Sequence, residues 1–561
     1  MSSFLFLAVP LLCFLVFLVP DRFKNYFSLV FSFACTCLFV WISMPMLTGL
    51  VSEVTIDLLE GPFTLTIHID YLSFFFFLVT TFTIFTASIY SGKYMEPYRE
   101  KYSPAMFSLH YFSFMWLYLS MIMVLFLQES LPFLICWELM GVSSFILVIF
   151  EAGIRTTLKS GVSYLIQMHI GFFILLAAFL VSDTQTSAGG FAGLAEYFGS
   201  HANTGLFLLF FIGFGLKAGF IPLHTWLPDA HPAAPSHISA VMSGVMIKMG
   251  IYGIFRVLTF VTSDLMTIGV IVLIVSVISG LFGVMMAIVQ HDLKKLLAYH
   301  SIENIGIIGI GMGIGTIGLA MENNTLVLLG FAGALLHVLN HSLFKSLLFF
   351  SAGSVYKAYH TRDIGMLGGV IRKMPYTAMF FAIGSIAICG LPPLNGFISE
   401  YLIFNGLFKG MADGSFLQVV VFLFAILGLV LIGGLAIYCF TKAFGMVFLG
   451  EPRTHFDHPI KEQGLSMLIP QVFITAAILV IGLWPGLILK PISMAVISVF
   501  PAAEGSYSFI PGNMQSISLI SGIFILLTLL LILAGYLQGR KHKISRGPTW
   551  GCGYTAPSPR Q

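Results

Sequence analysis

The chain has 561 residues, of which 58% are hydrophobic and only 9% are charged. A soluble core of this length does not have such a composition, so the sequence predicts a membrane protein that crosses the bilayer many times. The formal net charge of +3 gives no indication of nucleic-acid binding, because in a membrane protein the position of the charges carries the information.

Known cofactor motifs are missing from the sequence. None of the seven cysteines forms a C-x-x-C pair, so an iron-sulfur cluster or a structural zinc site is not predicted. Neither a Walker lysine loop nor a G-x-G-x-x-G between a strand and a helix is present. We therefore expect no cofactor in this chain and expect any redox centre to lie in a partner.

Apolar runs of spanning length follow one another along the whole chain, and they predict an all-α fold of about fifteen transmembrane helices. The first run has neither a basic leader nor a small-residue cleavage site, so we expect it to be retained as a span. The runs lie near residues 4–19, 26–48, 71–91, 110–127, 131–150, 160–181, 204–226, 236–258, 265–289, 296–320, 325–354, 375–408, 416–447, 465–489 and 515–537.

Charge divides the connecting loops into two alternating sets. One set is rich in lysine and arginine, as at Lys93, Arg99 and Arg362, and the other is acidic, as at Asp57, Glu196 and Asp264. By the positive-inside rule, the N-terminus lies outside and the tail lies in the cytoplasm. We expect a multi-pass protein of a bacterial or archaeal cytoplasmic (inner) membrane.

Two spans have sequences that break a helix. The seventh carries Lys217 just before Pro222 and Pro228, and the twelfth is interrupted by GLPPLNG at 390–396, just before Glu400. Broken helices at matching places in two halves indicate an inverted repeat with ion sites near the midplane. Ordinary proline kinks are the alternative. The predicted organisation is 1–109 with three helices, 110–258 and 265–447 as the two five-helix repeats, and 448–561 with two helices and a basic tail.

Five ionisable residues lie deep inside apolar runs, and each needs a partner or a wet cavity because charge is costly in hydrocarbon. These residues are Glu138, Lys217, Lys248, Lys345 and Glu400. Their default interpretation is a proton or ion path. Arg256 lies nearer the end of its span, so we expect its side chain to snorkel to the membrane surface.

Glu138 and Lys217 are natural partners for a switch. Such a pair titrates as a unit, so that separating the two charges releases the proton of the lysine and rejoining them favours its return. The alternative is a fixed ion pair that holds two helices together. Lys248, about halfway through the eighth span, would bridge Lys217 to later groups.

His337, His341 and Lys345 are spaced four residues apart, so they share one stripe of a helix. A row of titratable groups inside the membrane is suited to proton transfer between neighbours. Two alternatives stay open: metal binding by the two histidines, for which no third ligand is evident, and histidines that are simply satisfied by neighbouring groups.

Several runs carry a family resemblance. The run at 217–256 resembles the signature of the antiporter-like proton-translocating subunits of complex I, multisubunit sodium/proton antiporters and membrane-bound nickel-iron hydrogenases. Its sequence is KAGFIPLHTWLPDAHPAAPSHISAVMSGVMIKMGIYGIFR. The runs at 291–309, 390–406, 442–453 and 546–557 are most similar to the hydrogenase-4 and formate hydrogenlyase branch of this family. The resemblance covers nearly the whole chain.

The resemblance implies a relay of named residues. It would run through Glu138, Lys217, Lys248, His337, His341, Lys345 and Glu400, with His224, Asp229, His231 and His237 in support. The implied partners are other membrane subunits, antiporter-like or anchoring a quinone or hydrogenase module, and a soluble redox arm that holds nickel-iron and iron-sulfur centres. Relatives often continue into a lateral helix after the Trp-Gly-Cys-Gly motif, whereas this sequence ends at Gln561, so we do not expect a long lateral brace.

Three functions remain open at this stage. The first is a subunit that moves protons from cytoplasm to outside, driven by electron transfer in partners. The second is a sodium/proton antiporter subunit, and the third is a membrane anchor of a hydrogenase without net pumping. The chain itself is not expected to catalyse redox chemistry.

Overall fold

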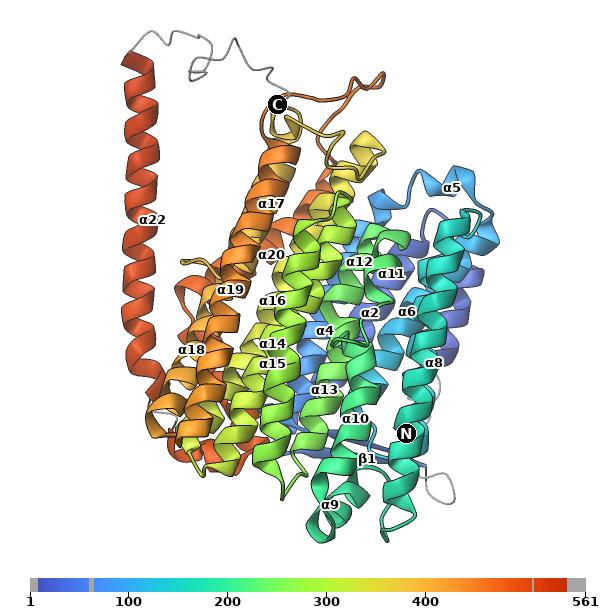
Figure 1. Cartoon of the computed structure of the whole chain (residues 1–561). Coiled ribbons are helices and arrows are strands. Elements are labelled where there is room, and N and C mark those ends of the chain that lie inside the picture. Colours follow the sequence, from blue (N-terminus) through green and yellow to red (C-terminus); the bar gives the residue numbers. More distant parts are fainter. Residues whose placement is uncertain (1–8, 60–64, 507–508, 542–561) are drawn as a thin grey trace.

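The computed structural model describes residues 9–59, 65–506 and 509–541. Within this part, the fold is a bundle of long helices that run roughly side by side, with one small hairpin of two strands (Figure 1). Among the described residues, twelve helices are long and apolar enough to cross a membrane. The predicted all-α polytopic class is therefore confirmed, while the count of fifteen and the inverted repeats stay predictions.

In hydrocarbon no water is present to bond the backbone amides and carbonyls. A helix pairs these groups within its own segment, which is why membrane-spanning segments are helical. Their bounds in chain order are α2 Lys24–Ile42, α4 Tyr71–Tyr94, α6 Pro104–Phe126, α7 Ser130–Val148, α8 Arg155–Asp183, α12 Ser236–Val241 continuing through the π-helical turn η3 Met242–Met246 into α13 Ile247–Leu258, α14 Leu265–Ile288, α15 Leu293–Ala320, α16 Asn324–Tyr359, α19 Phe416–Phe448, α20 Leu465–Leu483 and α22 Phe509–Lys541.

Both predicted breaks are present. The seventh run forms α10 Asn203–Ala218, a non-helical stretch and the short α11 Leu227–Ala233. The twelfth forms α17 Pro375–Ile388 and α18 Asn395–Asp413, separated by the Gly-Leu-Pro-Pro stretch. Proline lacks the amide hydrogen that a continuing helix needs, so the prolines at these places end the hydrogen-bond ladder.

Burial separates central from peripheral helices. In α15 and α16, 94% of the most apolar stretch of 18 residues is buried inside the bundle, whereas in α22 only 6% of that stretch is buried. Figure 1 shows α22 standing apart from the rest of the bundle. Small residues let the central helices approach closely, since a Cβ at Gly306 would lie 2.5 Å from the backbone nitrogen of Gly280.

The two ends of the bundle differ. One end carries the short helix α5 Tyr98–Lys101, and we call it the α5 end (Figure 1). The opposite end carries the hairpin of β1 Val54–Leu59 and β2 Leu65–Ile69 and the short helix α9 Gly190–Ser200. At this end Asp264 accepts the backbone amides of Thr204 and Asn203, which lower the pKa of its carboxyl.

The expectation for Arg256 is wrong. Its side chain is only 6% exposed and donates to both carboxylate oxygens of Asp70, at 2.6 and 2.9 Å. Burial alone would raise the pKa of Asp70, but the guanidinium charge and its hydrogen bonds hold that pKa below the ordinary value. Asp70 also caps α4 through Ser73. A buried partner 186 residues away thus keeps the arginine inside the bundle.

Two other expectations fall partly or wholly outside the described residues. Of the predicted span 4–19, residues 9–19 are described, and they contain a 3₁₀ helix, Cys13–Phe17. The basic tail beyond Lys541, with its Trp-Gly-Cys-Gly motif, lies outside the described part.

Candidate functional site

Lys217 lies at the end of α10, directly before the first helix break. Its ammonium is buried, 3.3 Å from Sδ of Met168 and over the rings of Trp137 and Tyr164, at 5.6 and 5.9 Å from their centroids. Aromatic faces stabilise a cation but accept no proton from it. The ammonium of Lys217 is thus held by a thioether sulfur and two aromatic faces, without a direct ion pair among the described residues.

Glu138, on α7, has a different direct partner from the one the sequence suggested. Its Oε1 lies 3.2 Å from Nε2 of His169 on α8, and the two side chains are 25% and 44% exposed. Lys217 interacts with Glu138 only through the longer-range attraction of their charges, not through a direct ion pair. The structure thus brings Glu138 and Lys217 into one neighbourhood and adds His169, which sequence reasoning missed.

Tyr164 connects this neighbourhood to the next one. Its hydroxyl lies 2.5 Å from Oγ of Ser144 and 3.6 Å from Sδ of Met246, a residue of η3. Lys248 follows two residues later. Its ammonium donates to the backbone carbonyl of Ser243, inside the same π-helical turn. π-helical turns often mark functional sites, and this one turns a carbonyl toward a buried lysine.

The predicted histidine stripe lies on α16 and is fully buried. His337 bonds Oγ of Ser399 on α18 through Nδ1, at 2.9 Å, and Oδ1 of Asn304 on α15 through Nε2, at 3.1 Å. Lys345 donates to the backbone carbonyl of Leu297, also on α15. The stripe therefore faces α15 and the second broken helix.

Two buried histidines keep both ring nitrogens without a hydrogen-bond partner among the described residues. These are His341 on α16 and His231 on α11, and each leaves both nitrogens unbonded. Buried polar atoms are normally paired, so these four ring nitrogens depart from the usual pattern. The charges of Lys248 and Lys345 act on both rings. We name Lys248, Lys345, His231, His337 and His341 the central cluster.

Glu400, on α18, lies against the second break. A Cβ added at Gly390 would be 2.4 Å from its Oε2, so the carboxylate rests on the bare backbone of this glycine. Gly390 has a φ of +62°, in the left-handed region that glycine adopts freely. The acidic group that acts electrostatically on Glu400 is Glu303 of α15, which the sequence analysis did not single out.

Other polar groups were also missed. His110 on α6 lies 3.0 Å from the predicted supporting residue His237, between their Nε2 atoms, and both rings are buried. His300 pairs with Glu303 inside α15. The signal for the second pair was present in the sequence, as a histidine and a glutamate three residues apart in an otherwise apolar span. His224 lies beside Phe282, with 5.2 Å between ring centroids.

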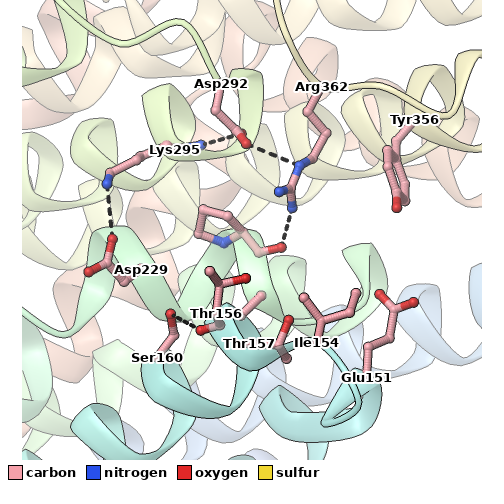
Figure 2. A pocket seen from close by; sticks show the side chains of 12 residues that line it. Glu151, Ile154, Thr156, Thr157, Ser160, Asp229, Asp292, Lys295, Tyr356 and Arg362 are labelled. Carbon is pink, nitrogen blue, oxygen red and sulfur yellow. Dashed lines mark hydrogen bonds and ion pairs between the residues drawn. The ribbon is translucent and has the colours of Figure 1, made fainter.

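Figure 2 shows the residues that line a polar cavity of about 230 Å³. The cavity belongs to the α5 end, because its lining residue Glu151 lies 3.9 Å from Lys101 of α5. Asp229 on α11 pairs with Lys295 at 2.9 Å, and Arg362 pairs with Asp292 at 3.1 Å. Figure 2 shows these two ion pairs above Thr156, Thr157 and Ser160 of α8. Because α11 carries both Asp229 in the cavity wall and His231 in the central cluster, this helix separates the cavity from the buried lysines.

No group of three or more His, Cys, Asp or Glu side chains suited to a metal ion occurs in the described residues. The ring nitrogens of His337 are engaged with Ser399 and Asn304 instead.

Buried lysines, histidines and carboxylates between two broken helices define a class of protein, the polytopic membrane proteins with ionisable groups in their interior. Residues 127–428 match the family described as NADH:quinone oxidoreductase/Mrp antiporter, transmembrane. The chain belongs to this family.

Curated relatives support the same assignment. The chain is 36% identical to hydrogenase-4 component B of Escherichia coli over 505 residues, covering 87% of this chain and 74% of the relative. It is 37% identical to formate hydrogenlyase subunit 3 of the same organism over 349 residues, or 62% of this chain and 56% of the relative. NADH-quinone oxidoreductase subunit M of Rickettsia bellii is 30% identical over 370 residues, or 65% and 70%.

Two solved structures share the fold. The first belongs to the Mrp complex of Dietzia sp., with a TM-score of 0.73 and 20% identity, covering 92% of this chain and 99% of that one. The second belongs to an archaeal membrane-bound sulfane sulfur reductase, with a TM-score of 0.78 and 23% identity, covering 98% and 87%. At this identity the likeness concerns the fold alone. The chain is thus an antiporter-like membrane subunit of the hydrogenase and complex I type.

Proposed function

We propose that this chain moves protons across a bacterial or archaeal cytoplasmic membrane, driven by electron transfer in partner subunits. The observation that carries the proposal is the central cluster, which gathers two lysines and three histidines in the buried interior of the bundle. Buried ionisable groups are costly to keep, and in membrane proteins they mark ion paths.

The relay begins at Glu138 and Lys217. A change in the partner subunits moves the Glu138 carboxylate relative to Lys217, which alters the proton affinity of the ammonium. Glu138 also lies beside His169, so its carboxylate has two basic neighbours, His169 and Lys217, and is attracted to both. The proton then passes by way of Lys248 and the histidines to Lys345, and leaves through Glu400.

Proton uptake starts at the cavity of the α5 end. Its walls carry hydroxyls, carboxylates and one accessible lysine, and α11 leads from this cavity to His231. Lys294, which is buried and donates to the backbone carbonyl of Ala234 at 2.6 Å, lies on the same route. The lysine- and arginine-rich loops support a cytoplasmic position for this end, with the N-terminus outside and the C-terminus in the cytoplasm.

The partner subunits contact the face formed by α7 and α8. A carboxylate and an imidazole that are 25% and 44% exposed near the middle of spanning helices are unfavourable against lipid. A neighbouring membrane subunit would supply polar groups there. The nickel-iron and iron-sulfur centres that carry the electrons belong to such partners and to a soluble arm.

The test is Lys217→Ala in the complete complex, purified with its own partners and inserted into vesicles. The expected result is a loss of proton movement, measured with a pH-sensitive dye, together with slower turnover of the electron donor. The exposed Lys93→Ala serves as the matched control. Normal proton movement in Lys217→Ala would leave the chain as a non-pumping anchor.

A sodium/proton antiporter subunit is the second candidate, favoured by the match to a family that includes Mrp antiporters. This function predicts sodium-dependent proton exchange in vesicles without any electron donor. Proton movement that needs the donor and ignores sodium selects the first function.

A further inference from the structure

His300 and Glu303 form an ion pair that the proposed relay does not use. Both side chains lie on α15 and are buried, with exposures of 0% and 1%, and Nδ1 of His300 contacts Oε2 of Glu303. Oε1 of Glu303 and Nε2 of His300 have no hydrogen-bond partner in the described part of the chain. A carboxylate oxygen is thus free at the centre of the bundle.

The charge of the pair reaches the last two members of the proposed relay. Lys345 donates to the carbonyl of Leu297, which precedes His300 by three residues on the same helix. The charge of Glu303 acts on both Lys345 and Glu400. Lys345 and Glu400 come from different helices, and the acidic group common to both of their surroundings is Glu303.

Other titratable groups of the described residues also face the pair. Cys439 of α19 is beside His300, and the ring of Phe440 covers the imidazole at 4.5 Å between centroids. Cys389, at the end of α17, lies within electrostatic reach of Glu303 and Glu400. The charge of Glu303 also reaches Lys345 and Glu400.

We propose that Glu303, held by His300, is the proton carrier between Lys345 and Glu400. The free Oε1 accepts the proton of the Lys345 ammonium, which becomes a neutral amine, and then delivers that proton to the Glu400 carboxylate. Glu303 returns to its anionic form, while His300 keeps its own proton in the hydrogen bond to Oε2 throughout. This inference rests on the proposed proton translocation and adds a residue to it.

A purely structural ion pair is the alternative, since buried pairs exist that only fix the packing of helices. The two roles differ in their chemistry. A structural role needs charge complementarity between positions 300 and 303, whereas proton transfer needs an acid at position 303 in particular.

The experiment uses the complete complex in vesicles and the variants Glu303→Gln, Glu303→Asp and His300→Gln. Glu303→Gln should slow proton movement about 100-fold, as expected when a positioned proton-transfer group is removed. Glu303→Asp keeps an acid and should restore part of the rate. The exposed Glu100→Gln is the matched control and should leave the rate unchanged.

Comparison with Lys217→Ala separates the two proposals. Normal proton movement in Glu303→Gln, with movement lost in Lys217→Ala, overturns the role of Glu303 and leaves the relay intact. Normal movement in both variants overturns the relay as well. If Glu303→Gln does not assemble, infrared difference spectra between acidic and alkaline medium are recorded for the wild type and Glu303→Asp. A protonated-carboxyl band that shifts between the two proteins supports Glu303 as the carrier. An unshifted band contradicts it.

Discussion

The carboxylate of Glu138 lies 3.2 Å from the imidazole of His169 and makes no direct ion pair with Lys217. The imidazole is a second basic neighbour of Glu138, beside the longer-range attraction of Lys217. The position of the carboxylate in the proposed relay therefore depends on both side chains.

His169→Asn should therefore change the rate of proton movement. Asparagine is polar but lacks the imidazole that contacts Glu138, so Lys217 remains as the basic neighbour of the carboxylate. The measurement is the initial rate of proton movement in vesicles. Ile166→Val, an exposed position on the same helix, is the control, and an unchanged rate in His169→Asn would refute the role of this imidazole.

The Asp70 and Arg256 pair should matter for stability. Asp70→Asn leaves a buried guanidinium without its counter-charge, which costs about 3–5 kcal/mol. Thermal unfolding of the detergent-solubilised complex should start at a lower temperature. The double variant Asp70→Asn with Arg256→Met should recover part of the lost stability. The control is Asp413→Asn, which removes one partner of the exposed ion pair with Lys409 and should have a much smaller effect.

The same pair predicts a direction of pH dependence. The folded-state pKa of Asp70 is held below its unfolded value of about 3.9. The stability from Asp70 is then fully present above that unfolded pKa and is lost as the pH falls through the folded pKa. Acid unfolding of the wild type should include this loss, while Asp70→Asn should lack it. Parallel acid unfolding of the two proteins would contradict this.

Gly390→Ala should displace Glu400. The added Cβ would lie 2.4 Å from Oε2 of Glu400, and the φ of +62° adds a strain of about 1 kcal/mol for a residue with a side chain. We expect slower proton movement in an assembled complex. Gly433→Ala on α19, where a Cβ meets nothing within 4 Å, should retain the wild-type rate.

Asp292 has two roles at the mouth of the cavity, and two substitutions separate them. Its carboxylate accepts the amides of Lys294 and Lys295 at 2.8 and 3.1 Å and pairs with Arg362. Asn caps helices about as well as Asp, so Asp292→Asn should preserve stability, while Asp292→Ala should cost about 1 kcal/mol.

Proton uptake gives the second readout for these variants. Both lose the carboxylate that faces the cavity, so both should show a lower rate when the medium is buffered weakly. A rate that falls only in Asp292→Ala would assign Asp292 to the helix cap alone.

Features within one helix could be predicted from the sequence. The apolar runs predicted the spans, the prolines beside Lys217 and Glu400 predicted the two breaks, and the four-residue spacing of His337, His341 and Lys345 predicted one buried stripe. Each of these follows from local rules, namely the length of a span, the missing amide of proline and the pitch of a helix.

Contacts between helices were decided by the tertiary structure alone. The partner of Glu138 is His169 on the next helix, the partner of Arg256 is 186 residues away, and the charge of Glu303 acts on both Lys345 and Glu400. The sequence contains all these residues but not the rotation and tilt of each helix against its neighbours. Those depend on how small and large side chains interlock along the entire bundle, and they determine which charges meet.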